Sequence, residues 1–149
     1  MQGTMLYGPR DVRFEQRPDP EIIEPTDAII KLAATCVCGS DLWPFRGIDE
    51  VTEPQPMGHE YAGIVEQVGG AVKNIKPGQF VVGSFFASHV HLHGGPAPVR
   101  RFLPELIDLI WKRKINPGKV FNLTLPLEQV AEGYRAMDER RAIKTLLRP

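Results

Sequence analysis

The chain has no excess charge of either sign and very few cysteines. Its 149 residues include 18 basic and 18 acidic side chains, so the formal net charge is zero. This balance gives no basic surface for nucleic acid and no attraction to an anionic membrane, and we predict neither as a partner. The two cysteines, Cys36 and Cys38, are separated by one residue, a spacing that makes a mutual disulfide sterically awkward. We therefore expect free thiols or metal ligands and no disulfide scaffold.

Long apolar runs and nucleotide-binding motifs are also missing. No segment reaches the roughly 18 apolar residues of a membrane-spanning helix, and the first five residues show no basic segment leading into an apolar one. We therefore predict a cytoplasmic protein. The 14 glycines form neither a Gly-x-Gly-x-x-Gly turn nor a Gly-x-x-x-x-Gly-Lys phosphate loop, so the sequence shows no nucleotide site.

Short apolar runs separated by turn residues fill the first 86 residues. Glycine and proline contribute 14 residues each, and pairs such as Gly69-Gly70 and Pro77-Gly78 suit reversals of the backbone. This pattern predicts a small barrel or sandwich. Its predicted strands include residues 11–16, 28–35, 61–68 and 79–86.

After Gly94-Gly95 the spacing of apolar residues changes. From Val99 to Ile110 they recur three and four positions apart, which predicts one face of a helix. A strand over residues 120–123, a second amphipathic helix over 127–137 and a last strand over 142–147 are predicted to follow. The chain is thus predicted to be one domain, mainly β with helices (α+β).

Two short motifs carry side chains that bind metals. Cys38-Gly39-Ser40-Asp41 places a thiol, a hydroxyl and a carboxylate within four positions, and Gly58-His59-Glu60 adds an imidazole and a second carboxylate. A thiolate and an imidazole are good zinc ligands, and a carboxylate can orient the imidazole through its other ring nitrogen. Spacing alone leaves two interpretations open: a zinc site, or a buried structural thiol and a separately hydrogen-bonded histidine.

These motifs, with the run from Pro77 to Gly83 and the tail from Ile143 to Leu147, resemble the zinc-containing medium-chain alcohol dehydrogenases in order and spacing. The resemblance covers nearly the whole chain. It implies a GroES-like β-barrel with C-terminal helices packed at its edge. It also implies a single domain over residues 1–149, made of a β part (residues 1–88) and an αβαβ tail (residues 89–149). The two parts are joined where the family carries its cofactor domain.

The resemblance implies a role for each residue of the two motifs. Cys38 and His59 would bind the catalytic zinc, and Glu60 would approach the metal or bind it transiently. Ser40 would relay the proton of the substrate alcohol, and Asp41 would fix the ring of His59. In the family, zinc activates the alcohol and the cofactor NAD(P) accepts the hydride.

Three features of the family have no counterpart in these residues: the glycine-rich turn of the cofactor domain, the four cysteines of the structural-zinc lobe, and the third protein ligand of the catalytic zinc. Two sources of a third ligand stay open. Cys36 is either a filler thiol or an adventitious ligand. His89, His91 and His93 are either ordinary surface side chains or, because strand alternation puts them on one face, donors to a new metal site. Trp43 stands where some members have a histidine that passes the proton to solvent.

Two functions are compatible with this reasoning. The first is a zinc-dependent alcohol dehydrogenase catalytic domain, which in the full-length family oxidises alcohols or reduces aldehydes and ketones, but which cannot transfer hydride alone. The second is a non-enzymatic GroES-like barrel or assembly module with a vestigial or rebuilt metal site. Phe85 and Phe86 belong to the surface that would have met the cofactor domain, so we expect a homo-oligomer through this apolar patch. The candidates to line an alcohol pocket are Ser40, Trp43 and Leu92.

Overall fold

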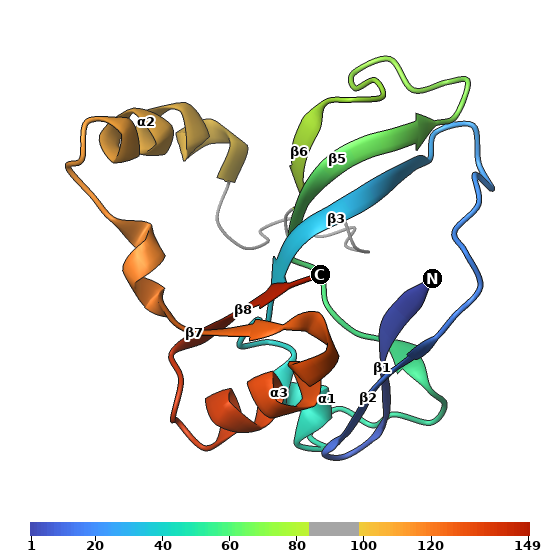
Figure 1. The fold of residues 1–149 in the computed structure, drawn as a ribbon, viewed down its shortest axis with the longest axis vertical. Coiled ribbons are helices and arrows are strands. Elements are labelled where there is room, and N and C mark those ends of the chain that lie inside the picture. Colours follow the sequence, from blue (N-terminus) through green and yellow to red (C-terminus); the bar gives the residue numbers. More distant parts are fainter. Residues whose placement is uncertain (84–98) are drawn as a thin grey trace.

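A computed structural model of the chain describes residues 1–83 and 99–149 and shows two β-sheets with short helices (Figure 1). The smaller sheet has the order β2-β1-β4 and the larger one the order β6-β5-β3-β8-β7. The prediction of a mainly β fold with helices (α+β) is confirmed. The strands are β1 (Gln2–Gly8), β2 (Asp11–Gln16), β3 (Ala28–Cys36), β4 (Gln55–Pro56), β5 (Tyr61–Val68), β6 (Phe80–Gly83), β7 (Phe121–Pro126) and β8 (Lys144–Arg148).

Among the described residues, three α-helices and two 3-10 turns connect the strands. They are α1 (Leu42–Phe45), α2 (Val99–Trp111), η2 (Pro117–Val120), η3 (Leu127–Gln129) and α3 (Val130–Asp138). Within residues 1–83 and 99–149, no helix is long and apolar enough to cross a membrane. The predictions for Phe85, Phe86, His89, His91, Leu92 and His93 fall outside the described residues.

The C-terminal tail joins the larger sheet through a β-α-β unit. β7 alternates half-buried and exposed residues, as a strand with one covered face does, and it pairs in parallel with β8. The connection between them is α3, which packs on β2 and β8. β8 then pairs antiparallel with the end of β3, at Thr35 and Cys36. The tail is therefore joined by hydrogen bonds to the strand that leads into the first motif.

The core lies between α3, α1 and the strands β1, β2 and β8 (Figure 1). Tyr134 and Phe45 are the largest fully buried side chains, and their ring centroids are 5.3 Å apart. The buried residues Val130, Tyr134 and Met137 recur at helical spacing, as predicted for the second helix. α2 lies away from the two sheets in Figure 1. Five of its apolar side chains are 40 to 53% exposed: Phe102, Leu103, Leu106, Ile107 and Ile110.

Candidate functional site

Pairing of β3 with β5 brings the two motifs together. The strands are antiparallel and their last pair joins Thr35 to Tyr61, so the residues that follow β3 lie beside those that precede β5. Val37 is buried at 1% exposure, and its N–H donates to the Thr145 carbonyl oxygen at 3.2 Å. Before His59, Gly58 adopts a φ of +102°, a left-handed conformation that glycine tolerates at low cost.

The side chains of Cys38, Ser40, Asp41 and His59 form one hydrogen-bonded group. The Ser40 hydroxyl donates to Cys38 Sγ at 3.3 Å and lies 3.4 Å from His59 Nε2. On the other side of the ring, His59 Nδ1 is 3.1 Å from Asp41 Oδ1. An ionised carboxylate only accepts hydrogen bonds, so this contact places a proton on Nδ1 and turns the lone pair of Nε2 toward the thiol and hydroxyl.

Asp41 is the buried anchor of this group, with 5% of its surface exposed. Its second oxygen, Oδ2, accepts the backbone N–H of Cys38 at 2.9 Å. Burial raises the pKa of Asp41, and the hydrogen bond from Cys38 and the nearby His59 ring offset only part of that rise. The carboxylate thus connects the loop after β3 to the ring before β5.

Glu60 lies in a different environment from its neighbour His59. Its Oε2 accepts a hydrogen bond from the Cys36 thiol at 2.9 Å and from Lys144 Nζ at 2.6 Å. Burial alone would raise the pKa of Glu60, but the hydrogen bonds from Cys36 and Lys144 outweigh it and lower that pKa. The Glu60 carboxylate is therefore bound by Lys144 and Cys36, and it is not part of the hydrogen-bonded group of Cys38 and His59.

Cys36 faces this carboxylate as a protonated thiol. Burial, followed by the hydrogen bond to Glu60, raises the pKa of Cys36 to about 12. Because metals bind the thiolate, these surroundings favour the filler-thiol interpretation of Cys36 over the interpretation as a third ligand.

The donors fit only part of a zinc site. Cys38 Sγ and His59 Nε2 face the same hydroxyl, as two ligands of one metal ion would. Within residues 1–83 and 99–149, however, no three His, Cys, Asp or Glu side chains form a group that could hold a metal. Two ligands do not make a stable zinc site. The described residues therefore supply two of the three protein ligands that the resemblance implies.

Two contributions to this region come from the C-terminal tail and were not predicted. Burial, and after it the charge of Asp41, raises the pKa of Tyr134 on α3. Lys144, the first residue of β8, pairs with Glu60. The sequence pattern assigned Tyr134 to an apolar helix face, and nothing in the spacing of either residue indicated a contact with the first two motifs.

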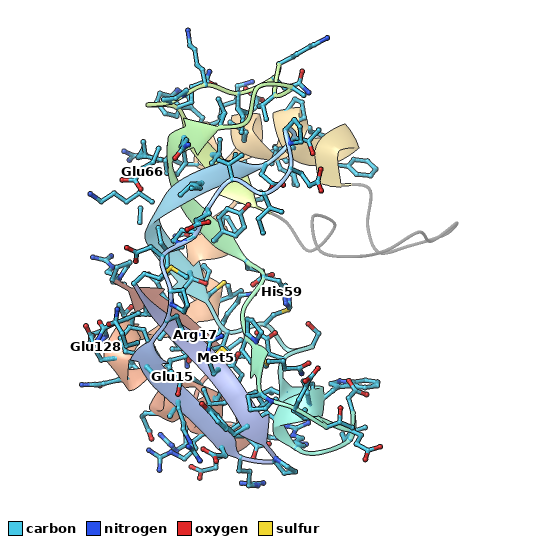
Figure 2. The ribbon with its side chains drawn as sticks, turned by 90° about the vertical axis from the view of Figure 1, so that its right-hand side faces the viewer. Met5, Glu15, Arg17, His59, Glu66 and Glu128 are labelled. Carbon is cyan, nitrogen blue, oxygen red and sulfur yellow. The ribbon has the colours of Figure 1, made fainter. Side chains whose placement is uncertain are left out.

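A cavity of about 380 Å³ between β1 and β3 reaches His59 and Glu60. Its volume is that of a small-molecule site. Of the predicted pocket residues, Trp43 is 55% exposed on α1, and neither Trp43 nor Ser40 lines this cavity. A larger cavity of about 710 Å³ is lined in part by Glu66 and Glu128, which Figure 2 shows on the opposite side of the ribbon from His59.

Comparisons with known proteins match this fold and these motifs. The sequence profile of the alcohol dehydrogenase GroES-like domain matches residues 24–96. Zinc-type alcohol dehydrogenase B of Aspergillus flavus is 41% identical over 88 residues, which are 59% of this chain and 21% of that protein. Sorbitol dehydrogenase of Rattus norvegicus is 41% identical over 83 residues, or 53% of this chain and 23% of that protein. The solved structure of an alcohol dehydrogenase from Thermus sp. ATN1 matches with a TM-score of 0.83 over 99% of both chains, and its 13% identity shows the fold alone.

The fold and the two motifs define a GroES-like domain of the dehydrogenase type. The chain is similar to the zinc-type alcohol dehydrogenases, and its residues 24–96 match the alcohol dehydrogenase GroES-like domain. It spans between 21 and 23% of the length of these two curated relatives.

Proposed function

We propose that these residues are the substrate-side half of a zinc-dependent alcohol dehydrogenase, able to bind zinc and to handle the proton of a small alcohol, but not to transfer hydride alone. The observation that carries this proposal is the convergence of Cys38 Sγ and His59 Nε2 on the Ser40 hydroxyl, with Nδ1 of the same ring held by Asp41. Zinc bound between thiolate and imidazole would act as a Lewis acid toward the hydroxyl of an alcohol.

The chain's own residues would prepare the site for that metal. Asp41 fixes the tautomer of His59, so that Nε2 presents its lone pair without a prior rearrangement. Ser40, which is exposed and contacts both donors, can exchange a proton with an alcohol and with solvent. Trp43 lies one turn further along the chain and is 55% exposed. Its indole has no ionisable group that could pass the proton on, so we propose that the proton is released from Ser40 to water.

The domain organisation is part of the proposal. We assign residues 1–88 to the β part and residues 89–149 to the αβαβ tail of one GroES-like domain, joined where the family carries its cofactor domain. NAD(P) would then need a site that these residues do not provide, since no glycine-rich pyrophosphate turn is present in the sequence. The names of the relatives include a sorbitol dehydrogenase, which supports small alcohols, polyols among them, as the substrate class.

Metal content and cofactor binding test this proposal together. The protein is purified with zinc supplied, its zinc is measured by elemental analysis, and NAD and NADP are titrated into it by isothermal calorimetry. We expect zinc bound by Cys38, His59 and a third ligand from outside the described residues, no heat of cofactor binding and no alcohol oxidation. Tight binding of either cofactor would overturn the assignment to the substrate-side half alone.

A second function is favoured by one observation. Because Glu60 is paired with Lys144 and the described residues bring together only two metal donors, the domain can also be a non-enzymatic assembly module with a vestigial metal site. This alternative predicts no zinc above trace in the elemental analysis and a discrete oligomer by light scattering. A zinc-containing protein that loses its metal on substitution of Cys38 would contradict it.

A further inference from the structure

One face of α2 is apolar and exposed. Five of its large side chains recur three and four positions apart, so they lie along one side of the helix. Trp111 is 86% exposed, and the other four are 40 to 53% exposed: Leu103, Leu106, Ile107 and Ile110. Among the elements that the structure describes, none packs extensively on α2, which lies apart from both sheets in Figure 1. These five side chains, the α2 stripe, therefore face the surroundings of the molecule.

A second apolar surface lies at the edge of the larger sheet. Among the described strands, β6 pairs only with β5, and its residues Phe80 and Val82 are 62% and 71% exposed. Ile64 of β5 stands opposite Phe80, so the two side chains project from the same face of the sheet, and Ile64 is exposed as well. Val82 follows Phe80 by two residues and lies on that face too. Ile64, Phe80 and Val82 thus form a second exposed surface, the β6 strip.

The exposed area of the two surfaces is that of a stable protein interface. A fully buried aromatic side chain removes about 150–250 Å² from water, and an aliphatic one somewhat less. At the exposures given above, the α2 stripe amounts to roughly 500 Å² and the β6 strip to roughly 300 Å². Each partner in a standard protein–protein interface buries about 800 Å². The two surfaces together therefore match what one copy contributes to a dimer.

We propose that two copies of the chain form a two-fold dimer, in which the α2 stripe of each copy packs on the β6 strip of the other. A helix packed on a sheet buries the apolar faces of both. Each copy carries one surface of each kind, so a two-fold axis covers all four. The zero formal net charge adds no long-range repulsion between the copies. The inference goes beyond the proposed function and beyond the patch predicted at Phe85 and Phe86, because its surfaces include neither the zinc site nor those residues.

The test measures the molar mass of the full chain by light scattering and by sedimentation, from about 1 µM to about 1 mM protein. We expect a monomer–dimer equilibrium. Ile107→Glu places a charge in the α2 stripe and Val82→Lys places one in the β6 strip, and each should weaken the dimer by about 30-fold or more. The matched control, Ile143→Glu, makes the same change at an exposed isoleucine outside both surfaces and should leave the dimer intact. A wild-type protein that stays monomeric throughout overturns the proposal and leaves both surfaces to a different partner.

Mixing the two variants tests the reciprocal arrangement. In a mixed dimer, one contact joins two unaltered surfaces, and the other brings the new lysine against the new glutamate. We therefore expect Val82→Lys and Ile107→Glu to form a dimer together at concentrations where each is monomeric alone. If helix faced helix, or strand faced strand, every contact of the mixed dimer would contain one altered surface. A mixture that stays monomeric thus overturns the packing of α2 on β6.

Circular dichroism checks that each variant is folded before its mass is interpreted. Should either variant unfold, hydrogen exchange of the wild-type protein at low and high concentration takes its place. The amides of α2 and β6 should then exchange more slowly where the dimer forms, and those of β2 should not change. Exchange in α2 and β6 that does not depend on concentration contradicts the proposal. None of these measurements needs zinc, so a dimer of a protein that binds no zinc supports this inference while the proposed function fails.

Discussion

Gly63→Ala is expected to destabilise the fold at the strand pair that supports the site. Gly63 lies in β5 opposite Leu32 of β3. A β-carbon at this position would lie 2.3 Å from the carbonyl oxygen of Lys31 and 2.7 Å from Ile30 Cγ2. Backbone oxygen cannot rotate away as the end of a side chain can, so β3 and β5 must separate locally. This pair also places the first motif beside the second.

The magnitude follows from two opposing effects. Overpacking of this kind costs about 1–3 kcal/mol, and a clash with backbone belongs at the upper end of that range. Alanine restricts the unfolded chain more than glycine does, and this effect alone would raise the free energy of unfolding by about 0.4–1 kcal/mol. We therefore expect a net loss of about 2 kcal/mol in the free energy of unfolding. With an unfolding entropy of about 2.1 cal/mol/K per residue over 149 residues, Tm should fall by about 6 °C.

The assay is thermal unfolding followed by circular dichroism, with the urea midpoint as an independent measure. The matched control is Gly70→Ala, because a β-carbon there meets nothing within 4 Å and Gly70 is exposed. The control should be neutral or slightly stabilising. The steric reasoning is refuted if Gly63→Ala unfolds within 1 °C of the wild type, or no earlier than Gly70→Ala, where the threshold of about 1 °C corresponds to about 0.3 kcal/mol.

Three further predictions concern single side chains. Cys38→Ser should lower zinc content in elemental analysis, because a hydroxyl is a far poorer ligand than a thiolate, and unchanged content would show that the metal binds elsewhere. Asp41→Asn should weaken zinc affinity by about 10- to 100-fold in competition with a chelator, whereas an unchanged affinity would remove Asp41 from the site. The Asp138 carboxylate accepts from Arg46 and pairs with Arg10, and both interactions lower its pKa. The ion pairs of Asp138 therefore stabilise the fold at neutral pH, and this stabilisation is lost as the pH falls below about 4. Asp138→Asn should be less stable than the wild type at pH 7. It should also lose less stability than the wild type between about pH 4 and pH 2. Parallel urea midpoints for the two proteins over that range would contradict this.

Regular strands could be predicted because their side chains alternate between a covered face and an exposed face of the sheet. The segments 11–16 and 61–68 match β2 and β5 residue for residue, and β3 runs one residue past its predicted end. The tail strand begins at Lys144, two residues after its predicted start, because the backbone N–H groups of Arg141 and Ala142 still bond to the Ala136 carbonyl oxygen at the end of α3. The sequence pattern does not single out β1, since Met5 and Leu6 are adjacent and both buried, which breaks the alternation.

The site was predictable only where residues close in sequence carry the chemistry. Cys38, Ser40 and Asp41 lie within four positions, and their resemblance to a known family supplied His59 as the partner. The role of Glu60 at the metal stays a prediction. Its contact with Lys144 could not be predicted from the sequence, because that contact depends on the pairing of β3 with β8. Contacts of this kind depend on tertiary packing, and a local pattern contains no information about them.

The tail belongs to the site as much as the motifs do. The family profile matches residues 24–96, which include all four residues of the hydrogen-bonded group but end before α2. Yet the Val37 N–H donates to the Thr145 carbonyl oxygen, and Lys144 donates to the Glu60 carboxylate. Each of these bonds crosses from the first part of the chain to the last fifty residues. Since the geometry of a metal site depends on the partners behind its ligands, the region of sequence similarity is smaller than the unit that sets the geometry of His59.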